Sequence, residues 1–105
     1  MLTYILLIWI HFISDFLLQN NYMAEGKSDS VYILLLHSFV YSILFSYFEI
    51  EYAIINGCLH FLVDGYTSML TKHFYMIRNR RMFFITIGAD QVIHLTFLFL
   101  TLKLF

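Results

Sequence analysis

Charged residues are scarce in this chain, at 12% of its 105 residues, and it contains no proline and only one cysteine. The formal net charge of −1 provides no excess of basic residues, so binding to nucleic acid is not expected. Cys58 has no second cysteine with which to form an intramolecular disulfide, and its apolar surroundings suit a small packing residue. These shortages argue against a nucleic-acid-binding domain and exclude a disulfide-stabilised scaffold.

Hydrophobic residues make up 61% of the chain and aromatic residues 20%, and the mean hydropathy is +0.78. A soluble domain of this length cannot bury so much apolar surface. Four apolar segments approach the roughly 20 residues that a membrane span needs: 1–19, 31–48, 52–70 and 82–104. Because backbone groups in lipid must bond internally, each segment is expected to be a helix. The sequence therefore predicts an all-α fold, a single four-helix integral membrane bundle over residues 1–105.

The basic residues predict how the bundle is oriented. Loops 20–30 and 71–81 lie on one side and contain most of them: Lys27, Lys72, Arg78, Arg80 and Arg81. The opposite side contains Glu49, Glu51 and one basic residue, Lys103. The positive-inside rule then places both loops in the cytoplasm and both termini outside, which we expect in the inner membrane of a bacterium. Asp29 or Ser30 is expected to cap the second helix.

Histidines and aspartates recur inside these apolar segments at a constant spacing. The first has His11 and Asp15 in HFISDFLLQ, the third has HFLVD, the fourth has DQVIH, and the second contributes a lone histidine. Residues four apart share one face of a helix, so both members of a pair can point at the same neighbour. Gln19 lies four residues after Asp15 and is expected on the same face of the first helix. The candidate site residues are His11, Asp15, His37, His60, Asp64, Asp90 and His94.

Four imidazoles and three carboxylates form a ligand set for a divalent transition metal, with zinc favoured over iron or manganese because of the nitrogen ligands. Ionisable groups are costly inside a membrane, so they are functional candidates by default. These seven candidate ligands are more than one tetrahedral metal ion can bind. The set can hold two ions bridged by an aspartate, or one ion with the remaining carboxylates orienting imidazoles.

A metal with an open position activates water, and Asp15, Asp64 or Asp90 would then act as general base in a hydrolase. Access from the lipid favours an amphiphilic substrate, whose head group Arg78, Arg80 and Arg81 could bind. Two alternatives remain open. The pairs can simply hydrogen-bond between helices in a structural or regulatory subunit, or they can conduct protons or metal ions. Membrane lipid is the expected partner, and further copies of the chain are possible partners because four spans enclose polar faces poorly.

Several motifs in one order give the chain a family resemblance. HFISDFLLQ, an MAEGK loop, HFLVD and DQVIH resemble the bacterial membrane-protein family known as domain of unknown function 3307, with HFxxDFxLQ, MAExK, HxxxD and DQxxH. The resemblance implies a small membrane protein of a bacterium or its phage, without an established activity. It adds Gln91 to the positions expected to orient ligands, alongside Gln19, and it includes Glu25 and Lys27 as loop residues that close the mouth of the site or remain solvated.

Overall fold

A computed structural model describes residues 1–19 and 26–104. These residues form helices and turns and no strand. The helical elements are α1 (Leu2–Phe12) with the π-helical turn η1 (Ile13–Leu17), α3 (Val31–Ile43) with the 3₁₀ turn η2 (Leu44–Tyr47), α4 (Ile50–Met76) and α5 (Arg80–Leu102). The prediction of an all-α fold with four helical segments is confirmed.

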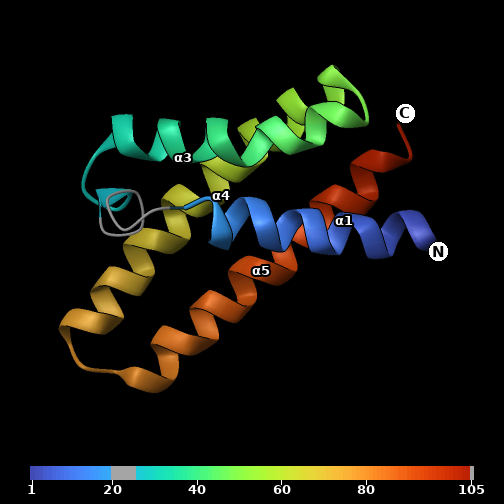
Figure 1. The fold of residues 1–105 in the computed structure, drawn as a ribbon. Helices are drawn as coiled ribbons and strands as arrows, with labels where there is room; N and C mark the ends of the chain where they lie inside the picture. Colours follow the sequence, from blue (N-terminus) through green and yellow to red (C-terminus); the bar gives the residue numbers. More distant parts are fainter. Residues whose placement is uncertain (20–25, 105) are drawn as a thin grey trace.

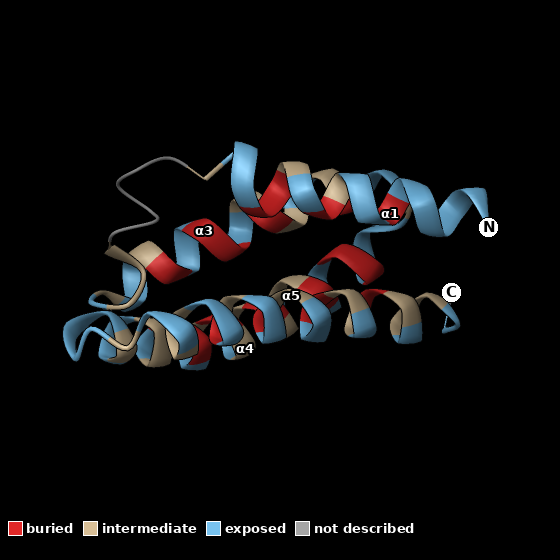
Figure 2. Cartoon of the chain, turned by 90° about the horizontal axis from the view of Figure 1, so that it is seen from below, coloured by how far each residue is buried: buried red, intermediate tan, exposed pale blue. Residues whose placement is uncertain are grey.

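The helices form two crossing layers, α1 with α3 and α4 with α5 (Figures 1 and 2). The chain reverses direction between successive helices. The N-terminus, the α3–α4 turn and the end of α5 therefore lie at one end of the molecule. The end of η1, the start of α3 and the α4–α5 turn lie at the opposite end, which we call the loop end.

The first helix changes its winding where the site begins. A π-turn follows α1, and the amide of Leu18 donates to the carbonyl of Ile13 at 2.9 Å. Such turns often occur at functional sites, because one extra residue rotates the following side chains. Ser14 and Asp15 are buried in this turn. Gln19 lies beyond the helix, so it does not continue the α-helical stripe expected from its spacing.

The third helix is longer than its apolar segment. Residues 71–81 were expected to form a loop, but α4 continues to Met76 and α5 begins at Arg80. Polar composition ends an apolar run without ending a helix, and no glycine or proline interrupts residues 71–76. The short turn places Arg78 in the left-handed region, at φ 58°. The side chain of Asn79 caps α5 by accepting from the Met82 amide at 3.2 Å.

The start of α3 differs in detail from the expected cap. Ser30 occupies the N-cap position, but its side chain makes no capping hydrogen bond. Asp29 instead forms an ion pair with Lys72 of α4. The carbonyl of Gly26 accepts from the amides of Asp29 and Ser30, each at 3.0 Å. The Asp29–Lys72 ion pair connects the residues before α3 to α4 at the loop end.

In the described part of the molecule, most buried side chains are polar and many large hydrophobic side chains are exposed. Figure 2 shows that the buried residues lie on the facing sides of the helices. The buried hydrophobic side chains are few: Leu7, Leu34, Tyr41, Phe45, Tyr52, Ala53 and Leu98. Buried polar and charged side chains outnumber them, whereas large hydrophobic side chains are exposed on every helix. By length and composition, α5 is the one described helix that could cross a membrane. The segments Leu2–Leu17 and Val31–Tyr47 are apolar but shorter.

Candidate metal centre

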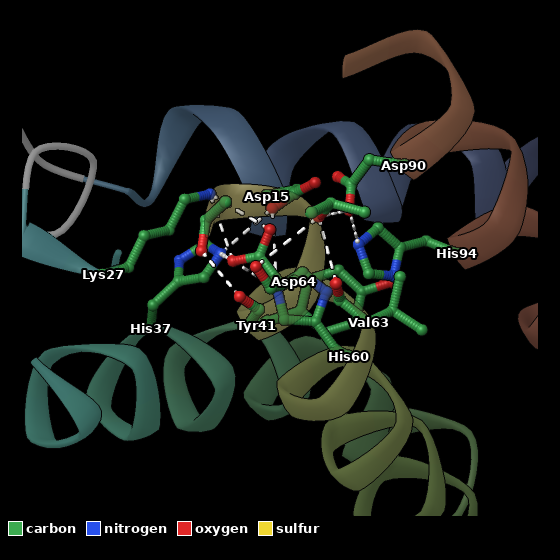
Figure 3. Close-up of polar contacts among 12 residues, drawn as sticks. Asp15, Lys27, His37, Tyr41, His60, Val63, Asp64, Asp90 and His94 are labelled. Atoms are coloured by element: carbon green, nitrogen blue, oxygen red, sulfur yellow. Dashed lines mark hydrogen bonds and ion pairs between the residues drawn. The ribbon is translucent and has the colours of Figure 1, made fainter. Parts of the chain in front are cut away.

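Side chains from all four helical segments converge inside the bundle (Figure 3). Within 4.8 Å of one another, their ligand atoms form three groups that could hold a metal ion: Asp15 with His37 and His60, His60 with Asp64 and His94, and Asp15 with Asp90 and His94. Every member is buried, with at most 6% of its surface exposed. Six of the seven predicted ligands therefore belong to groups that could bind metal.

Asp15 is held by hydrogen bonds from two other helices. Its Oδ1 accepts from Nε2 of His37 at 3.1 Å, and its Oδ2 accepts from the Gln91 amide at 3.1 Å. Its Oδ1 also lies 3.7 Å from Nε2 of His60. Both carboxylate oxygens of Asp15 are thus engaged by the protein itself.

Both carboxylate oxygens of Asp90 also accept hydrogen bonds. The Thr67 hydroxyl donates to Oδ1 at 2.5 Å and the Gln91 amide donates to Oδ2 at 3.1 Å. Nε2 of His94, one turn along α5, lies 3.0 Å from Oδ1. A carboxylate beside an imidazole fixes the ring orientation, which is how outer residues usually support a metal ligand.

The group of His60, Asp64 and His94 has the most unused binding capacity. Neither ring nitrogen of His60 makes a hydrogen bond to a described residue. Nε2 of His94 and Oδ2 of Asp64 make ion-pair contacts only, with Asp90 and Lys27. The rings of His60 and His94 stack at 4.3 Å, and Tyr41 stacks on His60 at 3.9 Å. Buried polar atoms without partners are unfavourable unless something binds them. Two histidines and one carboxylate form the ligand set of many catalytic zinc sites.

A lysine provides the charge that balances Asp64. Nζ of Lys27 lies 3.2 Å from Oδ1 and 3.1 Å from Oδ2 of that carboxylate, and 18% of the Lys27 side chain is exposed. His37 lies 3.5 Å from Oδ2. Of the two roles considered for Lys27, an ion pair at the mouth of the site and a solvated loop charge, the structure shows the ion pair. Glu25 of that motif lies outside the described residues.

His11 has a different environment from the other histidines. Its Nε2 donates to Oε1 of Gln91 at 2.7 Å, and its Nδ1 accepts from the Tyr41 hydroxyl at 2.8 Å. Both nitrogens are therefore engaged, and His11 belongs to none of the three groups among the described residues. It orients Gln91, which in turn holds Asp15.

A pocket of about 520 Å³ connects the site to the loop end. All three carboxylates line it, together with Gln19, Gln91 and Lys27. The described residues that line this pocket include the three carboxylates and none of the candidate histidines. Gln19 lines this pocket, and its Oε1 makes no hydrogen bond to a described residue.

The predicted head-group arginines lie near the α4–α5 turn. Arg78 and Arg80 line a second pocket of about 600 Å³, and Arg80 lies 5.8 Å from the ring centre of Phe84. Arg81 is exposed at the start of α5 and does not line this pocket. Tyr75 and Phe83 line both pockets, so the two are neighbours.

Sequence reasoning missed Tyr41 and Thr67. Tyr41 is 1% exposed, lies four residues after His37 and contacts both His11 and His60. Thr67 lies three residues after Asp64 and binds Asp90. The helical spacing that identified the His–Asp pairs also contained these two residues. A search for hydroxyl groups on the same faces would have found them.

Among curated proteins and solved structures, none matches the chain. A protein-family model described as "Protein of unknown function (DUF3307)" matches residues 2–105. The match covers nearly the full chain, and it confirms the resemblance inferred from the spaced motifs. The chain belongs to this DUF3307 family.

Proposed function

We propose that this protein is a four-span membrane protein whose buried His/Asp centre binds one zinc ion and hydrolyses an amphiphilic substrate. The observation that carries the proposal is the group of His60, Asp64 and His94. It combines a suitable ligand set with the buried ring nitrogens of His60, which make no hydrogen bond to a described residue, and it lies beside a pocket lined by carboxylates.

The distribution of polarity supports insertion into a membrane. A water-soluble domain buries hydrophobic side chains, whereas this chain buries histidines, aspartates and hydroxyl groups and exposes large hydrophobic ones. Helix α5 has the required length, and Leu2–Leu17 and Val31–Tyr47 approach the lower limit of about 17 residues. A lipid environment satisfies the apolar exterior of all four segments.

The distribution of charge supports the predicted orientation. Lys27, Lys72 and the arginines lie at the loop end, while Lys103 follows α5 at the other end. By the positive-inside rule the loop end faces the cytoplasm and both termini face outward. The pocket then opens toward the cytoplasmic leaflet. Since the site's side chains are buried within one chain, the site needs no second copy of the protein to be enclosed.

One ion fits the donor atoms better than two. The group of His60, Asp64 and His94 shares a histidine with each of the other two groups. An ion in this group therefore takes an imidazole from each of the other two groups, which have only Asp15 in common. Asp15 and Asp90 are already held by hydrogen bonds, so they can support the centre without acting as ligands.

The residues around the centre suit hydrolysis. The bound metal would supply Lewis acidity, which activates water near neutral pH. Asp15 lines the pocket and is oriented by His37 and Gln91, so it is the candidate general base. Asp90 orients His94 through their 3.0 Å contact, and Thr67 fixes Asp90.

The interior beyond the site supports a closed pocket over a path for ions. Leu7, Phe45 and Leu98 belong to a hydrophobic cluster on the terminal side of the histidines. Nearby polar groups are bonded to each other, as in the 2.9 Å contact from Asn56 to Thr101. Transport would need mobile polar groups that continue to the outer face.

Elemental analysis tests the metal centre most directly. Protein without a His-tag, purified in mild detergent, should retain about one zinc ion per chain after gel filtration. A structural cluster predicts no stoichiometric metal, and that result would refute the proposal.

Activity separates hydrolysis from transport. Chelated protein should lose turnover of short amphiphilic esters and phosphate esters and regain it with zinc. Metal flux into vesicles, lost in Asp64→Asn, without any such turnover would favour the ion-handling alternative.

A further inference from the structure

The pocket at the loop end has features that select a particular kind of substrate. Its inner end carries Asp15, Asp64 and Asp90, and its cationic groups are Lys27 and Lys72. Its volume of about 520 Å³ falls within the usual range for small-molecule sites, roughly 300–1,000 Å³. Three formal negative charges therefore face two positive ones, and the metal-free pocket does not favour an anion.

Metal binding would reverse that balance. A divalent ion at His60, Asp64 and His94 adds two positive charges next to the pocket and shares the Asp64 carboxylate with Lys27, whose ammonium lies 3.2 Å from Oδ1. The negative charge of Asp64 would then balance the metal as well as Lys27. The Lys27 side chain is only 18% exposed, so the excess positive charge at the edge of the site favours an additional anion.

A phosphate group fits the space beside the Lys27 ammonium better than a carboxylate does. A phosphate ester carries up to two negative charges and several acceptor oxygens, enough to contact a metal ion and Lys27 together. A carboxylate has one charge and two oxygens. Apolar side chains, including Phe16, Phe83 and Ile87, form another part of the pocket wall, and they suit the hydrocarbon part of an amphiphile.

We infer that the loop-end pocket binds the phosphate group of an amphiphile, that Lys27 selects this phosphate, and that binding depends on the metal. The inference rests on the metal centre proposed above and deepens it by naming the substrate class. It assigns the head group to Lys27 in the first pocket, in place of Arg78 and Arg80 in the second.

The test uses the full chain in detergent, loaded with zinc and checked for stoichiometry by elemental analysis. Calorimetry measures binding of inorganic phosphate and butyl phosphate, which differ in their hydrocarbon part. Lys27→Met removes the ammonium and Lys27→Arg keeps the charge. Lys103→Met is the matched control, because Lys103 is exposed at the opposite end.

Lys27→Met should lower the affinity for both ligands about tenfold or more. It should retain zinc, because the ammonium that competes with the metal for Asp64 is gone. Lys27→Arg should retain most of the affinity, and Lys103→Met should match the wild type. Removing zinc should weaken the binding of both ligands at least as strongly as Lys27→Met does. Ile87→Ala should weaken butyl phosphate about threefold and leave inorganic phosphate unchanged.

Three results would overturn the inference while the metal centre stands: equal phosphate binding by Lys27→Met, equal binding without zinc, or loss of binding in Arg80→Gln instead. Equal affinities for inorganic and butyl phosphate in the wild type would show that the pocket does not bind the hydrocarbon part of an amphiphile. Absence of zinc from the wild type would reject both the centre and the inference.

Discussion

Asp64→Asn and Asp15→Asn make the same chemical change at two carboxylates that both lie close to His37, and the structure predicts different results. Asp64 belongs to the group with His60 and His94, and its nearest described partner is Lys27, which balances its charge. Asp15 lies close by, but its oxygens are already used by His37 and Gln91. Only the first substitution removes a proposed ligand.

The expected magnitudes follow from these contacts. Loss of a residue that merely orients a ligand typically weakens metal binding about 10–100-fold, so Asp15→Asn should remain within that range. Asp64→Asn removes a direct ligand, and we expect a loss of more than about 100-fold. Asp15→Asn keeps one oxygen as an acceptor, and hydrogen bonds between membrane helices average only about 0.6 kcal/mol, so its fold should persist.

Competition with chelators of graded zinc affinity measures this difference, and circular dichroism and gel filtration check the fold. Asp64→Asn also leaves Lys27 without its partner, so the double variant Asp64→Asn/Lys27→Met serves as control. It should remain without zinc. If zinc returned in the double variant, or if Asp15→Asn lost zinc and Asp64→Asn kept it, the assignment of Asp64 as ligand would be wrong.

Three further predictions use matched pairs. His94→Asn should lose zinc, whereas His11→Asn should keep it with about 10–100-fold weaker binding, as chelator competition would reveal, because both His11 nitrogens already have partners. In thermal unfolding, Gly88→Ala should stabilise by up to about 1 kcal/mol because nothing lies within 4 Å of the added carbon, while Gly57→Ala should lose that gain, since its Cβ would lie 3.1 Å from Cβ of Ser42. Arg78→Gly should stabilise by about 1 kcal/mol by relieving the left-handed conformation, and Arg78→Ala should not. Equal zinc loss in the histidine pair, or equal melting temperatures within either other pair, would contradict the stated cause.

Much of the helical arrangement could be predicted because it depends on local patterns. The apolar segments and the four-residue spacing of His60 and Asp64 require only the geometry of a single helix. The end of α4 could not be predicted in this way, because residues 71–76 change in polarity without losing helical propensity. The pattern that predicts where an apolar segment ends does not report where backbone hydrogen bonding ends.

The different role of His11 shows why motifs alone do not identify ligands. HFISD and HFLVD have the same spacing, and the sequence treats their histidines as equivalent. In the first helix a π-turn begins two residues after His11, and Tyr41 and Gln91 reach its two nitrogens from other helices. In α4 the helix is regular, and neither nitrogen of His60 has such a partner. A ligand is thus distinguished by the binding capacity that neighbouring helices leave unused, and this depends on contacts between segments 30 to 80 residues apart in the chain.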